Sequence, residues 1–242
     1  MRKICFYNDG YYHVYNRGVD LRRIFMDEMD YRRFFESMYL FNDSNHKHRS
    51  GREVDRTLKL SAHEILQLDR EPLVDILSYC LIPNHFHIFL RQVQDGGVSH
   101  FLHGLGMGYA KYFNLRHKRT GSLFEGAYKV VHVKNEAHYY HVPRYIHLNA
   151  LDEIDPKWRN GLVDNWEEAM EFIDSYRWSS HHTYMGREQL LPVVERQDLL
   201  DELQDVSNYE KYLREWAGRN TMPYLPPDCP SLGDGPKMPV TE

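Results

Sequence analysis

Two apolar runs, 75–82 and 85–93, are separated in this chain only by a Pro-Asn dipeptide. Each has the length of a strand and is rich in aliphatic and aromatic residues, and so short a connection joins antiparallel neighbours. The second run begins His-Phe-His. Because side chains alternate across a strand, His85 and His87 share one face, roughly 7 Å apart at their Cα atoms. The pattern predicts a β-hairpin that carries two imidazoles on one face and apolar side chains on the other.

Strand and helix patterns alternate through the first 151 residues. Strands are expected over 11–15 and 128–134, beside the hairpin, and helices over 27–41, 98–119 and 135–151. The order strand, helix, strand, strand, helix, strand is that of the ferredoxin-like α+β fold, an antiparallel sheet with helices on one face. The two histidines are then expected on the face that those helices leave open. The helix after the fourth strand is expected to lie against this open face.

The chain is expected to have three parts. A catalytic-type domain covers 1–185 and includes a polar, basic inserted loop at 43–60, which precedes a short helix with a capping box between Ser61 and Glu64. A helical extension follows at 186–219. Beyond the ferredoxin-like part of the chain, helices are expected over 166–175 and 198–218. Residues 220–242 contain six prolines and little apolar periodicity, so this tail is expected to be disordered.

The net charge of −5 hides an uneven distribution. Residues 152–242 contain 19 acidic and 9 basic residues, whereas 1–151 contain 16 acidic and 21 basic ones. Within 97–134, basic residues alternate with aromatic ones. Because cations neutralise phosphates and rings stack on bases, this stretch predicts a surface for single-stranded nucleic acid. An alternative interpretation with equal weight is that this stretch is an ordinary solvated helix end whose aromatic residues belong to the core. The candidate contacts are Lys111, Arg116, Lys118, Arg119 and Lys129.

The three cysteines are scattered and form no C-x-x-C pair, so neither a disulfide framework nor a structural zinc site is expected. No apolar run is long enough for a signal peptide or a membrane span. The sequence therefore predicts a cytoplasmic protein that makes no use of a membrane.

Three polar residues share one face of the helix expected over 135–151. His141, Tyr145 and Asn149 follow at intervals of four, although a helical tyrosine more often serves packing than catalysis. If this face meets the histidines, two imidazoles and the Asn149 amide oxygen form a three-ligand site suited to Mg²⁺ or Mn²⁺. Tyr145 would then stand near the cation, where its phenolate could attack a bound phosphate. Pro143 is expected to kink the helix or to mark the start of a separate piece.

Five segments resemble, in order, a known family, the single-tyrosine HUH transposases, which include the REP-associated tyrosine transposases. The segments are YHVYNRG (12–18), IPNHFHIFL (82–90), YAKYFNLRHKRTGSLFEGAYK (109–129), YIHLN (145–149) and YRWSS (176–180). The resemblance implies a ferredoxin-like fold, His85 and His87 as the metal pair, Tyr145 as the nucleophile and Asn149 as the third ligand.

The mechanism implied by this resemblance is metal-assisted transesterification on single-stranded DNA, with a 5′-phosphotyrosine link at Tyr145. The expected partner is a strand that contains a hairpin, and a homodimer is one option. Two alternatives stay open. One is a ferredoxin-like single-strand binder in which Tyr145 is structural. The other is a metal-dependent hydrolase, for which His141 is the available additional ligand.

Overall fold

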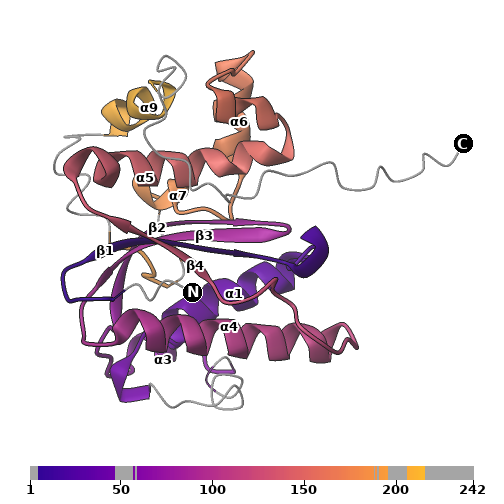
Figure 1. Cartoon of the computed structure of the whole chain (residues 1–242), viewed down its shortest axis with the longest axis vertical. Coiled ribbons are helices and arrows are strands. Elements are labelled where there is room, and N and C mark those ends of the chain that lie inside the picture. Colours follow the sequence, from indigo (N-terminus) through magenta and orange to yellow (C-terminus); the bar gives the residue numbers. More distant parts are fainter. Residues whose placement is uncertain are drawn as a thin grey trace, which may run out of the picture.

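The computed structural model describes residues 5–46, 57, 59–187, 189, 191–195 and 206–215 of the 242-residue chain. Its centre is a four-stranded sheet (Figure 1). The strands are β1 (Tyr11–Arg17), β2 (Val74–Ile82), β3 (His85–Gln92) and β4 (Lys129–Val133). They lie in the order β2-β3-β1-β4, and every neighbouring pair is antiparallel. The predicted ferredoxin-like α+β topology is confirmed.

Two long helices cover one face of the sheet, α1 (Glu28–Leu40) and α4 (Gly97–Arg116) (Figure 1). The Asp27 side chain caps α1 by accepting hydrogen bonds from the backbone of the first turn. The predicted capping box between Ser61 and Glu64 begins a short helix, α3 (Ala62–Leu66). The 3₁₀ turn η1 (Val19–Leu21) precedes α1, and the 3₁₀ turn η2 (Ser44–His46) precedes α3.

Two glycines of α4 let this helix approach the end of α1 closely. A Cβ on Gly104 would lie 2.9 Å from the Phe41 ring, and one on Gly108 would lie 2.5 Å from it. Both distances are shorter than real carbon contacts, so only glycine fits at these positions. The helix-propensity cost of about 1 kcal/mol for each glycine is offset by the packing of Phe41 against the helix backbone.

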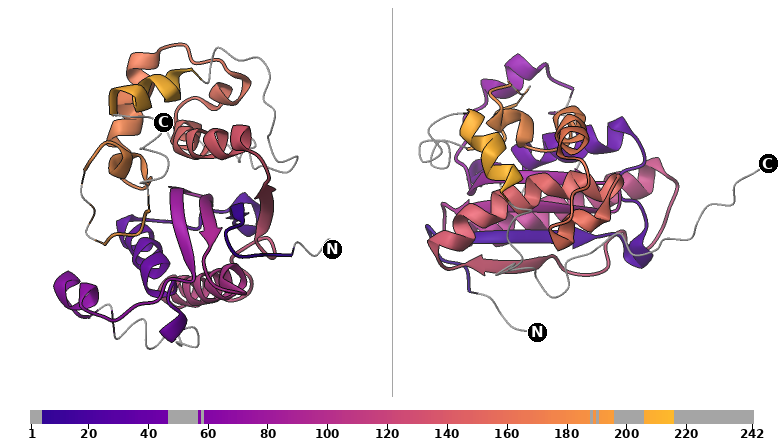
Figure 2. Two further views of the ribbon diagram at one scale, coloured as in Figure 1. Left: turned by 90° about the vertical axis from the view of Figure 1, so that its left-hand side faces the viewer. Right: turned by 90° about the horizontal axis from the view of Figure 1, so that it is seen from above.

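A second helical layer covers the other face of the sheet (Figures 1 and 2). Its long helix, α5 (Glu136–Leu148), is capped by Asn135 and runs through Pro143 without a break, although a kink or a second piece was predicted. The chain then tightens into 3₁₀ turns, so the predicted α-helical end at residue 151 is wrong. The remaining elements are η3 (Asn149–Glu153), η4 (Pro156–Asn160), α6 (Trp166–Ser175), α7 (His181–Tyr184) and α9 (Val206–Arg214).

The sheet therefore separates two apolar cores. Phe86, Ile88 and Leu90 pack with α1 and α4, as the alternation in β3 predicts. Phe89 packs in the second core with the buried side chains of α5, α6 and α9. The histidine-bearing face was predicted to be open apart from one helix, but this second core closes it.

Most of the predicted basic loop at 43–60 lies outside the described residues, as does the whole of the predicted tail at 220–242. The start of the loop is anchored, because Asp43 is buried and accepts a hydrogen bond from the Glu71 backbone N–H at 3.1 Å. Of the predicted helix over 198–218, the described part is α9. Among the described residues, no helix has the length and apolar character needed to cross a membrane.

Candidate active site

Strand β3 places His85 and His87 on the face covered by α5, and both side chains are fully buried. The neighbouring strand β1 adds two aromatic side chains to the same face. The His87 ring stacks on Tyr15, with 5.5 Å between ring centroids, and on His13, with 5.1 Å. His13 was not predicted as a site residue. Its position on the inward face of β1 follows from strand alternation, but its pairing with His87 depends on the register between β1 and β3.

Hydrogen bonds fix the orientation of both rings. Nδ1 of His85 donates to Asn84 Oδ1 at 2.6 Å, and since this oxygen can only accept, the proton lies on Nδ1 and the lone pair on Nε2. Nδ1 of His87 lies 2.9 Å from Nε2 of His13 and makes a hydrogen bond with it. A hydrogen bond at Nδ1 is typical of histidines that bind metals through Nε2.

Burial keeps these imidazoles neutral. Desolvation, together with the positive charge of Arg159, lowers the pKa of His85 to about 3. Desolvation also lowers the pKa of His13 to about 3 and that of His87 well below its ordinary range. A neutral imidazole has a lone pair to donate, so both predicted ligands are in the protonation state that a cation requires.

Helix α5 places Tyr145 directly over the histidines. The Tyr145 ring contacts His87 and His13 edge to face, with centroid distances of 5.6 and 5.8 Å. Its side chain is only 2 % exposed, so bulk solvent does not reach it in this structure. His141, one turn earlier on α5, is half-buried, and burial lowers its pKa to about 4. The charge of His141 lowers the pKa of His13, so the two rings lie close enough to interact.

An arginine outside α5 contacts the tyrosine hydroxyl. Arg159 lies in η4, and its Nη1 donates to Tyr145 Oη at 2.8 Å. The same guanidinium donates to Asn149 Oδ1 at 2.9 Å and makes an ion pair with Asp152. Sequence reasoning missed Arg159 and Asp152, because they follow the helix in short 3₁₀ turns that have no apolar periodicity.

The donor set beneath Tyr145 fits a divalent cation. Nε2 of His85 is buried and makes no hydrogen bond within the described part of the chain, and Asp152 Oδ2 lies 3.9 Å from it. The side chain of Asn149 is close enough to His85 to influence its pKa. In the described ranges, no group of three or more His, Cys, Asp or Glu side chains could hold a metal ion. A cation here would therefore depend on the amide oxygen of Asn149 as well as on the histidine pair.

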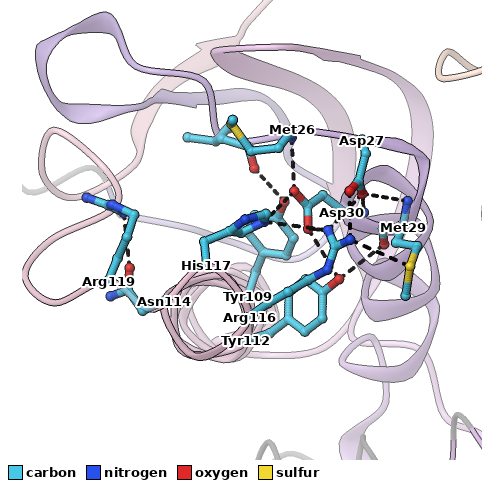
Figure 3. Close-up of polar contacts among 11 residues, drawn as sticks. Met26, Asp27, Met29, Asp30, Tyr109, Tyr112, Asn114, Arg116, His117 and Arg119 are labelled. Atoms are coloured by element: carbon cyan, nitrogen blue, oxygen red, sulfur yellow. Dashed lines mark hydrogen bonds and ion pairs between the residues drawn. The ribbon is translucent and has the colours of Figure 1, made fainter.

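Arg116, a predicted DNA contact, takes part in an ion-pair cluster between α4 and α1 (Figure 3). Its guanidinium lies 2.6 Å from a carboxylate oxygen of Asp27 and 2.5 Å from one of the buried Asp30. His117 and Tyr112 also hydrogen bond to Asp30. The hydrogen bonds from Arg116 lower the pKa of Asp27 to about 2. The charge of Arg116 is thus already balanced by two carboxylates.

The other predicted DNA contacts lie on both sides of the sheet. Lys111, Lys118 and Arg119 belong to α4 or to the turn after it, across the sheet from α5 (Figure 1). Lys111 and Lys118 are exposed, whereas Arg119 donates to Asn114 Oδ1 at 3.1 Å. Lys129 pairs with Tyr15 in the β1–β4 register, so its side chain shares the histidine face.

One basic residue near the histidines was missed. Arg17 is the β1 partner of His85 in the register, and it makes an ion pair with Glu125 at 2.6 Å. Its charge lowers the pKa of His85, which places the guanidinium near that ring. The alternation in β1 indicates its face, but the sequence contains no signal for its neighbour on β3.

Fold and site together define a ferredoxin-like α+β protein with a buried H-x-H pair beneath a tyrosine-bearing helix. Residues 45–149 match the model of a family described as "Transposase IS200 like". The match includes His85, His87, Tyr145 and Asn149.

A comparison with curated proteins gives no match. Among solved structures, the chain is similar to a REP-associated tyrosine transposase bound to a REP hairpin. The two share 12 % sequence identity at a TM-score of 0.46, over 81 % of this chain and 90 % of the other.

Proposed function

We propose that this chain is a transposase that cleaves and rejoins single-stranded DNA through a covalent link to Tyr145. The observation that best supports the proposal is the contact of the Tyr145 ring with His87, at 5.6 Å between centroids. Tyrosine and histidine pair come from the same chain, so the proposed site needs no second subunit, and a homodimer is not part of the proposal. The proposed catalytic unit is the region 1–185, with α9 of the extension packed on α5 through a hydrogen bond between Tyr209 and His147.

His85, His87 and Asn149 are the residues that would hold a divalent cation, Mg²⁺ or Mn²⁺. Members of the IS200-like family are generally metal dependent. A cation bound there supplies positive charge that polarises the scissile phosphate and stabilises the charge that develops on it. The chain itself keeps the imidazoles neutral through burial and aims their rings through Asn84 and His13.

The proposed reaction exchanges one phosphodiester for another. Tyr145 Oη forms a bond to phosphorus while the bond from phosphorus to the 3′ oxygen breaks. The phenolic proton is lost and the leaving oxygen gains one, so the products are a 5′-phosphotyrosine and a free 3′-OH. Rejoining is the reverse, with a 3′-OH as the attacking group, and because the bond energy is retained no ATP is consumed.

The direct test is to incubate the full chain with single-stranded DNA that contains a hairpin, in Mg²⁺ or Mn²⁺. We expect a protein–DNA adduct that survives denaturation, that is absent in EDTA and that peptide mass spectrometry assigns to Tyr145. If hairpin and unstructured strands are bound but no adduct forms under any of these conditions, the proposed chemistry is wrong.

A non-catalytic single-strand binder is the second candidate. Full burial favours it, because Tyr145, His85 and His87 have almost no exposed surface. In that function the tyrosine packs the second core, and His87 and His13 hydrogen bond to each other. The adduct assay separates the two candidates, since a binder retains DNA only under native conditions.

Replacing the proposed ligands should reduce cation affinity and adduct formation together. The buried positions make alanine a poor choice, because removing a buried ring leaves a cavity that costs several kcal/mol. We therefore expect His85→Gln and His87→Gln to weaken Mn²⁺ binding, measured by electron paramagnetic resonance, and to abolish the adduct. Asn149→Ala should have a milder effect, because water can replace one neutral oxygen ligand.

His132→Gln is the matched control for these ligands. His132 lies on β4, and its ring stacks on Tyr12 on the opposite face of the sheet. This variant should bind Mn²⁺ as wild type does. Unchanged Mn²⁺ affinity in both His85→Gln and His87→Gln would contradict the proposed metal site.

The proposed phosphate contacts are Lys111, Lys118, Arg119 and Lys129. Single alanine variants should each reduce the slope of log affinity against log salt concentration by about 0.7, the value for one phosphate contact on a single strand. Arg116→Ala is unsuitable here, because it would leave Asp30 buried beside α4 without its ion pair. Fluorescence anisotropy over a salt series gives the slopes. Slopes equal to wild type in all four variants would exclude these residues as phosphate contacts.

A further inference from the structure

The charged group that contacts the Tyr145 hydroxyl belongs to a segment beyond the family match, which ends at residue 149. Arg159 reaches back from η4 and donates through Nη1 to Tyr145 Oη at 2.8 Å. Its Nη2 donates to Asn149 Oδ1 at 2.9 Å. One guanidinium therefore connects the proposed nucleophile with the proposed third metal ligand.

Asp152 holds this guanidinium in a fixed orientation. Its two carboxylate oxygens accept from Nε and Nη2 of Arg159 at 2.9 and 2.5 Å, which is the bidentate geometry of a strong ion pair. The Trp158 ring N–H donates to the same carboxylate at 2.7 Å. All three side chains are buried. Burying this ion pair has a desolvation cost that apolar side chains of similar volume would avoid. The fixed geometry of the guanidinium, rather than added stability, is therefore what the ion pair can contribute to function.

We propose that Arg159 is a positioning residue for Tyr145, an inference that rests on the proposed function. The planar guanidinium sets the direction of the Tyr145 hydroxyl and of the Asn149 carboxamide at the same time. It also places a permanent positive charge beside the atom that attacks phosphorus. The ammonium of a lysine cannot reproduce this fork of donors.

Two variants separate positioning from simple loss of structure. Arg159→Gln removes the guanidinium but leaves Asp152 buried with an unbalanced charge, so it can fail to fold. The double variant Arg159→Gln with Asp152→Asn removes both charges and keeps similar side-chain volumes. Thermal melting selects the variant that remains folded. Arg144→Gln is the matched control, because Arg144 precedes Tyr145 on α5 but its guanidinium lies 4.1 Å from the centroid of the Tyr212 ring.

The first readout needs neither DNA nor metal. The ¹³Cζ NMR resonance of Tyr145, assigned by its absence in Tyr145→Phe, reports the hydrogen bond to the hydroxyl. We expect it to shift in the folded Arg159 variant and to stay in place in Arg144→Gln. A resonance that does not move in the Arg159 variant would show that the arginine does not orient this hydroxyl.

The second readout is the single-turnover rate of adduct formation at saturating DNA. We expect the folded Arg159 variant to be about 100-fold slower than wild type, the loss typical of a single buried electrostatic donor. Affinity for single-stranded DNA in EDTA should remain near the wild-type value, and Arg159→Lys should restore little of the rate. A wild-type rate in the folded variant overturns the inference, whereas the absence of adduct from wild type itself overturns the proposed function.

Discussion

Replacing Tyr145 with phenylalanine should abolish the covalent adduct and leave the affinity for single-stranded DNA nearly unchanged. Covalent capture needs the phenolic oxygen, since no other atom of this side chain can form the phosphodiester. DNA affinity depends on phosphate contacts and base stacking elsewhere on the surface. Denaturing gels with labelled DNA measure the adduct, and anisotropy in EDTA measures the affinity. An adduct in Tyr145→Phe would exclude Tyr145 as the nucleophile.

The same substitution should also lower the stability of the protein. The ring packs in the second core, and the hydroxyl accepts a hydrogen bond from Arg159 Nη1 at 2.8 Å. Phenylalanine keeps the ring but removes this buried hydrogen bond to a charged group, which costs about 1–3 kcal/mol. The expected result is a folded protein with a reduced melting temperature.

Tyr139→Phe and Tyr140→Phe are the controls on the same helix. The Tyr139 ring packs against Tyr11 and Phe89 at centroid distances of 5.0 and 5.7 Å, away from the histidine pair. The backbone oxygen of Tyr140 accepts a hydrogen bond from the Tyr212 hydroxyl. Both variants should form the adduct at the wild-type level. Loss of the adduct in Tyr140→Phe instead would move the nucleophile to that residue.

Local sequence signals were sufficient for the central fold. The hairpin of β2 and β3 follows from two apolar runs and a two-residue connection, and its observed bounds are 74–82 and 85–92. The helix predicted over 166–175 is observed with the same bounds. These signals depend on neighbours in the chain, through strand alternation, helix periodicity and caps. They therefore predict these elements without any knowledge of tertiary contacts.

The helix after the fourth strand lies on the histidine face, as predicted, but the additional cover of that face was not predicted, for a tertiary reason. Strand alternation shows that His85 and His87 share a face, but not what covers it. The cover consists of α5 together with the 3₁₀ turns η3 and η4, in which Trp158 and Arg159 are buried. Short 3₁₀ turns have no long apolar period, so no sequence pattern places them over the site.

The ion-pair partners of Arg116 could not be predicted from the sequence either. Arg116 lies in a basic, aromatic stretch, and charge alone predicts a phosphate contact. In the structure it pairs with Asp27 and Asp30, which are distant in sequence but adjacent across the α1–α4 interface (Figure 3). The roles of Tyr145, His85, His87 and Asn149 themselves remain predictions. The structure brings them together, but only chemistry on DNA can test them.

Acid should destabilise this protein steeply between pH 7 and pH 5. His13 and His85 have ordinary pKa values of 6.5 that burial lowers to about 3 in the folded chain. Between these values the unfolded chain binds protons that the folded chain does not, so stability falls as the pH falls. Each such histidine costs about 2 kcal/mol on going from pH 7 to pH 5. Burial lowers the pKa of His87 and His147 as well, which adds to the loss.

Urea unfolding at pH 7, 6 and 5 in EDTA measures this loss without interference from bound cations. The two histidines alone should remove about 4 kcal/mol, a large part of the 5–15 kcal/mol that is typical of a folded domain. His13→Gln should make the pH dependence shallower by about one proton, because glutamine has no charge to gain in the unfolded chain. His100→Gln, at an exposed position on α4, is the control for the effect of substitution itself. If His13→Gln has the same slope as wild type, His13 takes up a proton in the folded protein as readily as in the unfolded chain. A ring that accepted a proton so easily could not be enclosed between His87 and Tyr145 in the manner described, and the geometry of the whole site would need revision.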